Sequence, residues 1–99
     1  MDEQKLERVI QAEGLNAPRL TPEAIDAVIV DKTFTVLPSG KVMVCEVTLV
    51  NGFTVRGEAS VISKANFRQE IGEEISFINA RSKIWELEGY LLQSKLAEV

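Results

Sequence analysis

Histidine is absent from this 99-residue chain, and cysteine occurs once. Without histidine the chain lacks the commonest general base and the commonest metal ligand. A lone cysteine, Cys45, can neither close an internal disulfide bond nor complete a zinc site of known spacing. It lies in an apolar run, where a small buried side chain is expected. We therefore predict no metal site, no cofactor, no catalytic residues and no enzyme activity, and an enzyme built on an acidic pair stays only as a residual alternative.

Long apolar runs are also missing. No stretch approaches the roughly 20 apolar residues of a membrane span. The N-terminal sequence MDEQKLERVIQAE is charged and helical in pattern, unlike the apolar core of a secretion signal. We expect a protein of a reducing cytoplasm with no membrane partner.

Basic residues are in deficit, with 11 Lys and Arg against 15 Asp and Glu and a net charge of -4. This balance argues against a surface that neutralises nucleic-acid phosphates. Lys and Arg interrupt the acids in almost every segment, which argues against a DNA mimic as well. The composition, with 45% hydrophobic and 26% charged residues, is ordinary for a globular protein and predicts one domain over residues 1–99.

Two short helices are predicted before the first strand. The first has three apolar side chains on one stripe among charged residues: Leu6, Val9 and Ile10. Gly14 supplies its C-terminal stop. Thr21 is a typical N-cap with Pro22 at the first helical position, so a second helix should run to about Ile29.

Three antiparallel strands in a meander are expected at about residues 32–37, 42–50 and 53–61, which gives an α+β fold with the helices. Pro38-Ser39-Gly40-Lys41 indicates the first turn. Asn51-Gly52 indicates a two-residue type I′ hairpin turn, in which both central residues take positive φ. That turn would place four pairs on one face: Val50 with Phe53, Thr48 with Val55, Glu46 with Gly57, and Val44 with Ala59.

On that register the opposite face of the middle strand carries Met43, Cys45, Val47 and Leu49. Neither face of residues 42–50 is then cleanly polar. We expect a central strand covered by a helix on one side and partly covered on the other.

The most informative element is a long C-terminal helix, predicted from about residue 64 to 96 with Ser63 as its cap and a bend at Gly72 or Gly89 as an option. Two apolar stripes run along it. One stripe comprises Phe67, Ile71, Ile75, Ile78, Trp85, Leu92 and Leu96, and the other comprises Phe77, Ala80, Ile84, Leu87 and Leu91. A three-stranded sheet covers only one of them, so the second should meet the N-terminal helices, a second copy of the chain or a partner. A homo-oligomer through this helix, with a dimer favoured, is one expectation.

Three segments of the chain are informative together: TLVNGFTVRGEAS, ANFRQEIGEEI and the closing AxxKIWxLEGYLL. They resemble a family of small bacteriophage proteins named after gene forty-nine of a short-tailed coliphage and gene sixty-six of a Shigella phage, and TPEAIDAVI is similar to the way such proteins begin. Ser63 departs from the pattern, where an aspartate followed by proline is usual. The resemblance implies a non-structural phage protein made in the cytoplasm of the infected bacterium, and it carries no activity to transfer.

Six residues are candidates for a binding surface: Glu58, Asn66, Arg81, Lys83, Trp85 and Tyr90. Glu58, Asn66, Lys83 and Tyr90 match the family pattern without an evident structural reason. Arg81 and Lys83, together with Asn79, form a polar cluster that could hold a phosphate or a carboxylate, or could simply be a solvated helix face. Trp85 and Tyr90 could anchor an interface, with core packing as the alternative for Trp85.

Two functions follow as hypotheses. The first is a non-enzymatic phage accessory protein that binds and modulates a host protein, in host takeover or counter-defence. The second is an oligomer that sequesters a small anionic ligand, such as a signalling nucleotide, between subunits through Asn66, Arg81 and Lys83.

Overall fold

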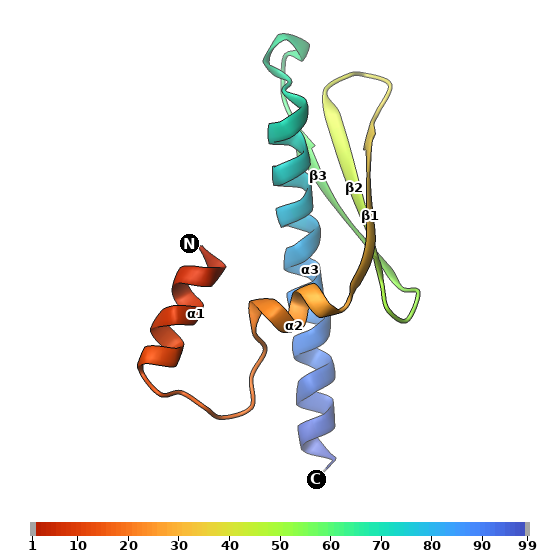
Figure 1. Ribbon diagram of the computed structural model, residues 1–99. Helices are drawn as coiled ribbons and strands as arrows, with labels where there is room; N and C mark the ends of the chain where they lie inside the picture. Colours follow the sequence, from red (N-terminus) through yellow and green to blue (C-terminus); the bar gives the residue numbers. More distant parts are fainter. Residues whose placement is uncertain (1, 99) are drawn as a thin grey trace.

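The computed structural model describes residues 2–98 and shows the predicted α+β fold (Figure 1). Its elements in chain order are α1 (Glu3–Ala12), α2 (Pro22–Ala27), β1 (Ile29–Val36), β2 (Val42–Leu49), β3 (Thr54–Ser60), the 3-10 turn η1 (Lys64–Asn66) and α3 (Gln69–Ala97). Helix α2 carries the predicted cap, since the Thr21 side chain accepts from Ala24 N, and α1 is capped by Asp2, whose side chain accepts from Gln4 N. No helix within the described residues is both long and apolar enough to cross a membrane.

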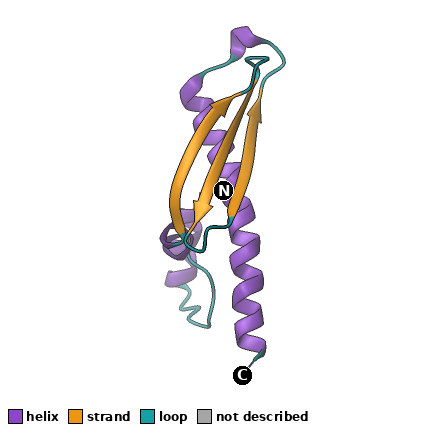
Figure 2. Ribbon diagram, turned by 90° about the vertical axis from the view of Figure 1, so that its right-hand side faces the viewer, coloured by secondary structure: helices purple, strands orange, loops and turns teal. Residues whose placement is uncertain are grey.

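The three strands form an antiparallel meander in the order β1-β2-β3. The long helix α3 lies across one face of this sheet, mainly over β2 and β3, and the other face is open (Figure 2). Thr33, Glu46, Arg56 and Glu58 point from the open face toward solvent. The expectation that this second face is partly covered was wrong within the single chain, because its outward positions are mostly polar and need no cover.

The predicted hairpin register was wrong by one residue. Val47 pairs with Val55, and Cys45 pairs with Gly57. The loop has three residues instead of two, since Leu49 N donates to Phe53 O at 2.8 Å. Gly52 has a φ of +88°. Among residues 2–98 only glycines have a positive φ, so the φ of Asn51 is negative, whereas a type I′ turn requires a positive value there.

This loop is instead a type I turn followed by a glycine in the left-handed region. Gly52 N donates to Leu49 O at 2.8 Å, which closes the turn, and the Asn51 side chain accepts from Phe53 N at 3.0 Å. The extra residue shifts β3 so that its apolar side chains share the face of the apolar residues of β2. The sheet therefore has one apolar face rather than two mixed ones.

The long helix begins later than predicted. Ser63 caps η1, its Oγ accepting from Ala65 N at 3.3 Å, and the extended backbone at Phe67 and Arg68 separates η1 from α3. From Gln69 the helix continues without interruption through both glycines to Ala97. The second helix is also shorter than predicted, because Val28 O already accepts from Val50 N at 3.0 Å as the chain enters the sheet.

The core lies between α3 and the sheet. Its buried members come from α2, β2, β3 and α3: Ile25, Cys45, Val47, Leu49, Val55, Ala80 and Ile84. The buried positions of α3 include the small residues Gly72, Ser76 and Ala80 at intervals of four, which form one side of the helix. Gly57 lies against this side with no room for a Cβ, so a glycine at this position permits the close approach of the helix.

Candidate functional site

A groove runs between the tip of the β2–β3 hairpin and the C-terminal half of α3. It consists of two adjoining hollows, of about 370 and 290 Å³, that share Phe53, Leu87 and Tyr90. Leu91 extends the apolar lining along the helix. Phe53 is 55% exposed and Tyr90 is 79% exposed, although both are aromatic. We call this feature the Phe53–Tyr90 groove.

The hairpin loop and the length of α3 together create the groove. Phe53 is the first residue after the three-residue loop, so its side chain stands near the tip of the hairpin, next to the helix. Leu87, Tyr90 and Leu91 follow the three-and-four spacing that puts side chains on one side of a helix. Figures 1 and 2 show α3 continuing past the end of the sheet, where no strand covers it.

Charged residues of both signs flank the apolar lining. Lys83 and Glu86 of α3 line the first hollow, and Glu88 lines the adjoining one. Arg56 borders the first hollow from β3, but its guanidinium lies on the open face of the sheet, where Nη1 donates to Thr54 Oγ1 at 3.4 Å. An apolar centre with a polar border is the usual layout of a protein interface. The groove is thus suited to an apolar side chain or short segment of another protein.

A second polar feature joins α1 to the rest of the molecule. The Arg81 guanidinium donates to both carboxylate oxygens of Glu3 at distances from 2.9 Å, to Asp26 at 2.6 Å and to the backbone oxygen of Pro22 at 3.1 Å. Trp85 Nε1 also donates to Glu3, at 3.0 Å. We call this set the Arg81 clamp. Its position explains why Trp85 is half-buried against the core instead of free on the helix surface.

The clamp shifts the protonation equilibria of its members. The hydrogen bonds from Arg81 hold the pKa of Glu3 below its usual value; burial acts in the opposite direction, and the Trp85 indole assists Arg81. The same contact with Glu3 raises the pKa of Arg81. A second pair, Glu7 with Arg19 at 2.6 Å, lowers the pKa of Glu7 in the same way and ties α1 to the connector before α2.

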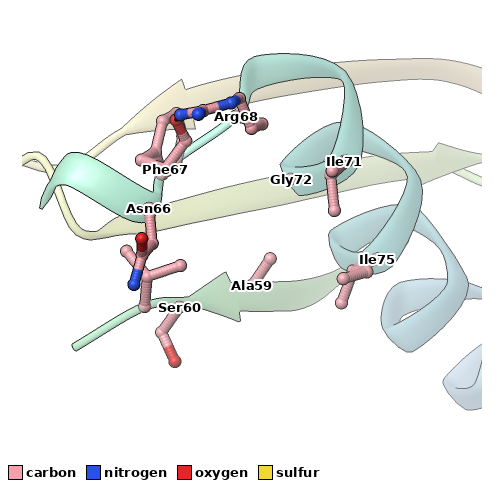
Figure 3. Close-up of a pocket in the computed structure, with 9 residues that line it drawn as sticks. Ala59, Ser60, Asn66, Phe67, Arg68, Ile71, Gly72 and Ile75 are labelled. Carbon is pink, nitrogen blue, oxygen red and sulfur yellow. The ribbon is translucent and has the colours of Figure 1, made fainter. Parts of the chain in front are cut away.

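A smaller hollow of about 50 Å³ lies where α3 begins (Figure 3). Ile71 and Ile75 reach from α3 toward Ala59 of β3, and Phe67 and Asn66 border it. Its size suits one branched aliphatic side chain and excludes a nucleotide. No group of three or more potential metal ligands occurs among residues 2–98.

Comparison with known proteins identifies the origin of the chain. A family model for phage protein (N4 Gp49/phage Sf6 gene 66) matches residues 20–96. The chain belongs to this family. No curated protein and no solved structure was found to match it. The family resemblance predicted from the hairpin and helix motifs is confirmed, and the match also includes the TPEAIDAVI segment of α2.

The region shared with the Gp49/gene 66 family contains α2, the whole sheet and nearly all of α3. The Phe53–Tyr90 groove lies entirely within it. Helix α1, with Glu3 and Glu7, lies outside the matched range. The groove therefore lies within the part of the chain that matches the family, whereas the Arg81 clamp fastens a segment outside that part.

The six predicted binding residues lie at four separate places. Lys83 and Tyr90 line the groove, and Arg81 and Trp85 belong to the clamp. Asn66 is in η1, before the start of α3. The Glu58 side chain is exposed on the open face of the sheet, while its backbone oxygen accepts from Asn79 Nδ2 of α3 at 2.7 Å. With a rise of about 1.5 Å per residue, Asn66 and Lys83 are separated by roughly 20 Å along the helix. Asn66, Arg81 and Lys83 therefore do not converge on one ligand within a single chain, and the Arg81 guanidinium already meets two carboxylates.

Phe53, Leu87 and Leu91 were not predicted as binding residues. The sequence placed Phe53 in a strand and both leucines on an apolar stripe of the long helix, which is the usual pattern for core residues. The length of the helix was the signal that could have indicated an exposed apolar surface. A helix of 29 residues is longer than a strand of seven or eight residues, so the sheet cannot cover all of its turns.

Proposed function

We propose that this phage protein acts in the infected bacterium by binding a host protein through the Phe53–Tyr90 groove and altering its activity. The observation that carries the proposal is the pair of exposed aromatic side chains, Phe53 and Tyr90, lining the same hollow beside Leu87. Aromatic side chains in hollows that a partner can desolvate contribute most of the binding energy at protein interfaces. The membership in a phage family supplies the context of infection.

The scaffold supports binding because it holds these side chains on regular elements. Phe53 immediately precedes β3, and Leu87 and Tyr90 project from the C-terminal half of a 29-residue helix. A tyrosine or phenylalanine loses little conformational entropy on binding, since it has only two side-chain torsions. A partner would therefore meet a largely preorganised apolar surface.

The border of the groove supports specificity. Lys83, Glu86 and Glu88 of α3 present charges of both signs around an apolar centre. Such a border selects partners with complementary charges and affects the rate of association more than the final affinity. The predicted partner surface is an apolar segment that is flanked by both acidic and basic residues.

The test compares groove variants during infection. Tagged wild-type protein, Tyr90→Asp and Phe53→Asp are expressed in infected cells, purified, and their bound host proteins quantified by isotope-labelled mass spectrometry. We expect one host protein to be enriched with the wild type and reduced at least about 30-fold with either variant, since loss of a central aromatic costs about 2 kcal/mol or more.

Ile62→Asp serves as the matched control. Ile62 is 95% exposed in the segment after β3 and does not line the groove, so its replacement adds a charge without touching the proposed surface. The control should retain the host protein. Equal recovery from all variants, or no host protein enriched above untagged infected cells, would overturn the proposal.

A further inference from the structure

Helix α1 is joined to α3 by one carboxylate. Within the described part of the chain, Glu3 is the only α1 residue that hydrogen-bonds to α3, through the Arg81 clamp. The one buried residue of α1 is Glu7, whereas Leu6 and Val9 are 45% and 51% exposed. A helix that belongs to a core buries its apolar stripe instead. Charged contacts, more than apolar packing, therefore hold α1 on the domain.

The receptor for this carboxylate is held in place from α2. Arg81 Nη1 donates to Asp26 at 2.6 Å, and Nη2 donates to Pro22 O at 3.1 Å. The Nε–Nη2 edge of the same guanidinium faces Glu3, with both nitrogens at 2.9 Å from its oxygens. Trp85, one turn further along α3, points its Nε1–H at the same carboxylate. Three N–H groups thus converge on one position, in the geometry that binds a carboxylate most strongly.

The apolar part of the contact with α1 is incompletely filled. A hollow of about 130 Å³ lies beside the receptor, between Leu6 and Ile10 of α1 on one side and Leu20, Pro22 and Trp85 on the other. Well-packed protein interiors contain few voids larger than a water molecule. The side chains of α1 are therefore smaller than this surface accepts, and larger apolar side chains at the same two positions would fill it.

We propose that this surface is a second binding site of the protein, for an acidic amphipathic helix of another protein, and that α1 occupies it in the unbound chain. The convergent N–H groups require a carboxylate at the position of Glu3. The hollow requires apolar side chains larger than Leu6 and Ile10, three and seven residues later. These spacings place all three side chains on one side of a helix, as in other helix-in-groove complexes.

The site is distinct from the Phe53–Tyr90 groove. Trp85 and Leu87 are two residues apart, which corresponds to about 200° around the helix, so the two surfaces lie on opposite sides of α3. The residues that form the receptor and its apolar wall lie within the range matched by the family, whereas α1 lies outside it. A partner helix therefore competes with α1 and not with a protein in the groove. Because α1 is tethered, it competes at a high effective concentration.

The test measures binding of a helical peptide to the full chain after α1 has been released. Glu3→Lys releases α1, since it places two cations opposite each other. The probe is a fluorescein-labelled peptide with the sequence of residues 2–13, cross-linked between positions 8 and 12, which are both exposed, so that it is helical. Fluorescence anisotropy should show at least about 10-fold tighter binding to Glu3→Lys than to the wild type, where α1 competes. Trp85, the only tryptophan, should change its emission on binding.

Three variants test the carboxylate receptor in the Glu3→Lys chain. Glu3→Gln in the peptide and Arg81→Gln in the chain should each weaken binding at least about 10-fold, because each removes one side of the charged contact. Arg68→Gln is the matched control: it removes the same charge from the exposed start of α3 and should bind the peptide like its parent. Circular dichroism confirms that each chain is folded. No binding to Glu3→Lys, binding that is insensitive to Arg81→Gln, or unchanged Trp85 emission would overturn the proposal.

A further peptide tests the apolar half of the site. Leu6→Phe in the peptide should bind the Glu3→Lys chain more tightly than the native sequence, because the larger ring fills the 130 Å³ hollow. Equal or weaker binding would overturn the requirement for a larger apolar side chain.

Discussion

Gly57 of β3 lies directly against one turn of α3, where a Cβ at residue 57 would overlap both the Ser76 carbonyl oxygen and the Ala80 backbone nitrogen. This contact fixes the distance between helix and sheet. It brings the helix close enough for Ala80 and Ile84 to be buried against β2 and β3. The position of α3, and with it the Phe53–Tyr90 groove, depends on this glycine.

Gly57→Ala should lower the free energy of unfolding by about 3 kcal/mol, because the obstructing atoms are backbone and α3 must shift as a whole. Urea denaturation followed by circular dichroism measures the change. Gly89→Ala is the control: its new Cβ would meet only Leu20, at 3.9 Å, and alanine favours the helix. The control should be as stable as the wild type or more so, and similar losses in both variants would contradict the proposed role of Gly57.

Arg81→Gln should release α1 without unfolding the sheet and α3. It removes the hydrogen bonds to Glu3 and Asp26, a loss of about 1 to 2 kcal/mol because both carboxylates are partly exposed. Trp85 is the only tryptophan and bonds to Glu3, so its fluorescence reports the release. Arg8→Gln, on the exposed side of α1, should leave the spectrum unchanged. An unchanged spectrum in Arg81→Gln would show that other contacts hold α1.

Acid should detach α1 in the same way. The pKa values of Glu3 and Glu7 are lowered in the folded protein, so the unfolded state binds protons first as the pH falls. The stabilisation is complete above the ordinary glutamate pKa of about 4.3 and is lost as the pH falls through the lower folded-state values. Trp85 fluorescence should stay constant from neutral pH to about 5 and change below about 4. In Glu3→Gln this transition should be absent, and its persistence there would assign it to another group.

The Cys45 thiol should react slowly in the native protein. Burial raises its pKa and keeps the reactive thiolate scarce. Labelling with a thiol reagent should therefore require opening of the core, and its rate should rise by several orders of magnitude in denaturant. Rapid labelling at neutral pH without denaturant would contradict the packing of α3 against β2.

Local signals in the sequence predicted most of the fold. Thr21 with Pro22 predicted the start of α2, the strand expected at about residues 42–50 corresponds to β2, and the long helix expected at about residues 64–96 overlaps most of α3. The errors arose where two local rules competed. Asn51-Gly52 favours a two-residue turn, but a third residue lets the apolar side chains of β3 join those of β2, and burial outweighs the turn preference.

The candidate site was less predictable for a physical reason. A leucine that lines an exposed groove and a leucine in a core give the same helical pattern, so Leu87 could not be told from Ile84. The role of Arg81 depends on Glu3, 78 residues earlier in the chain, and no local pattern indicates such a pair. Lys83 and Tyr90 were predicted as binding candidates from the family motif, and the structure places both at the groove.

The most direct test of the proposed host-binding role is photo-crosslinking during infection. 4-Benzoylphenylalanine is placed at position 90 in the groove and, as the control, at position 33, where Thr33 is exposed on the open face of the sheet. We expect one host protein to become attached at position 90 and not at position 33. Attachment of the same proteins at both positions, or attachment at position 90 only to a second copy of the chain, would contradict binding of a host protein through the Phe53–Tyr90 groove.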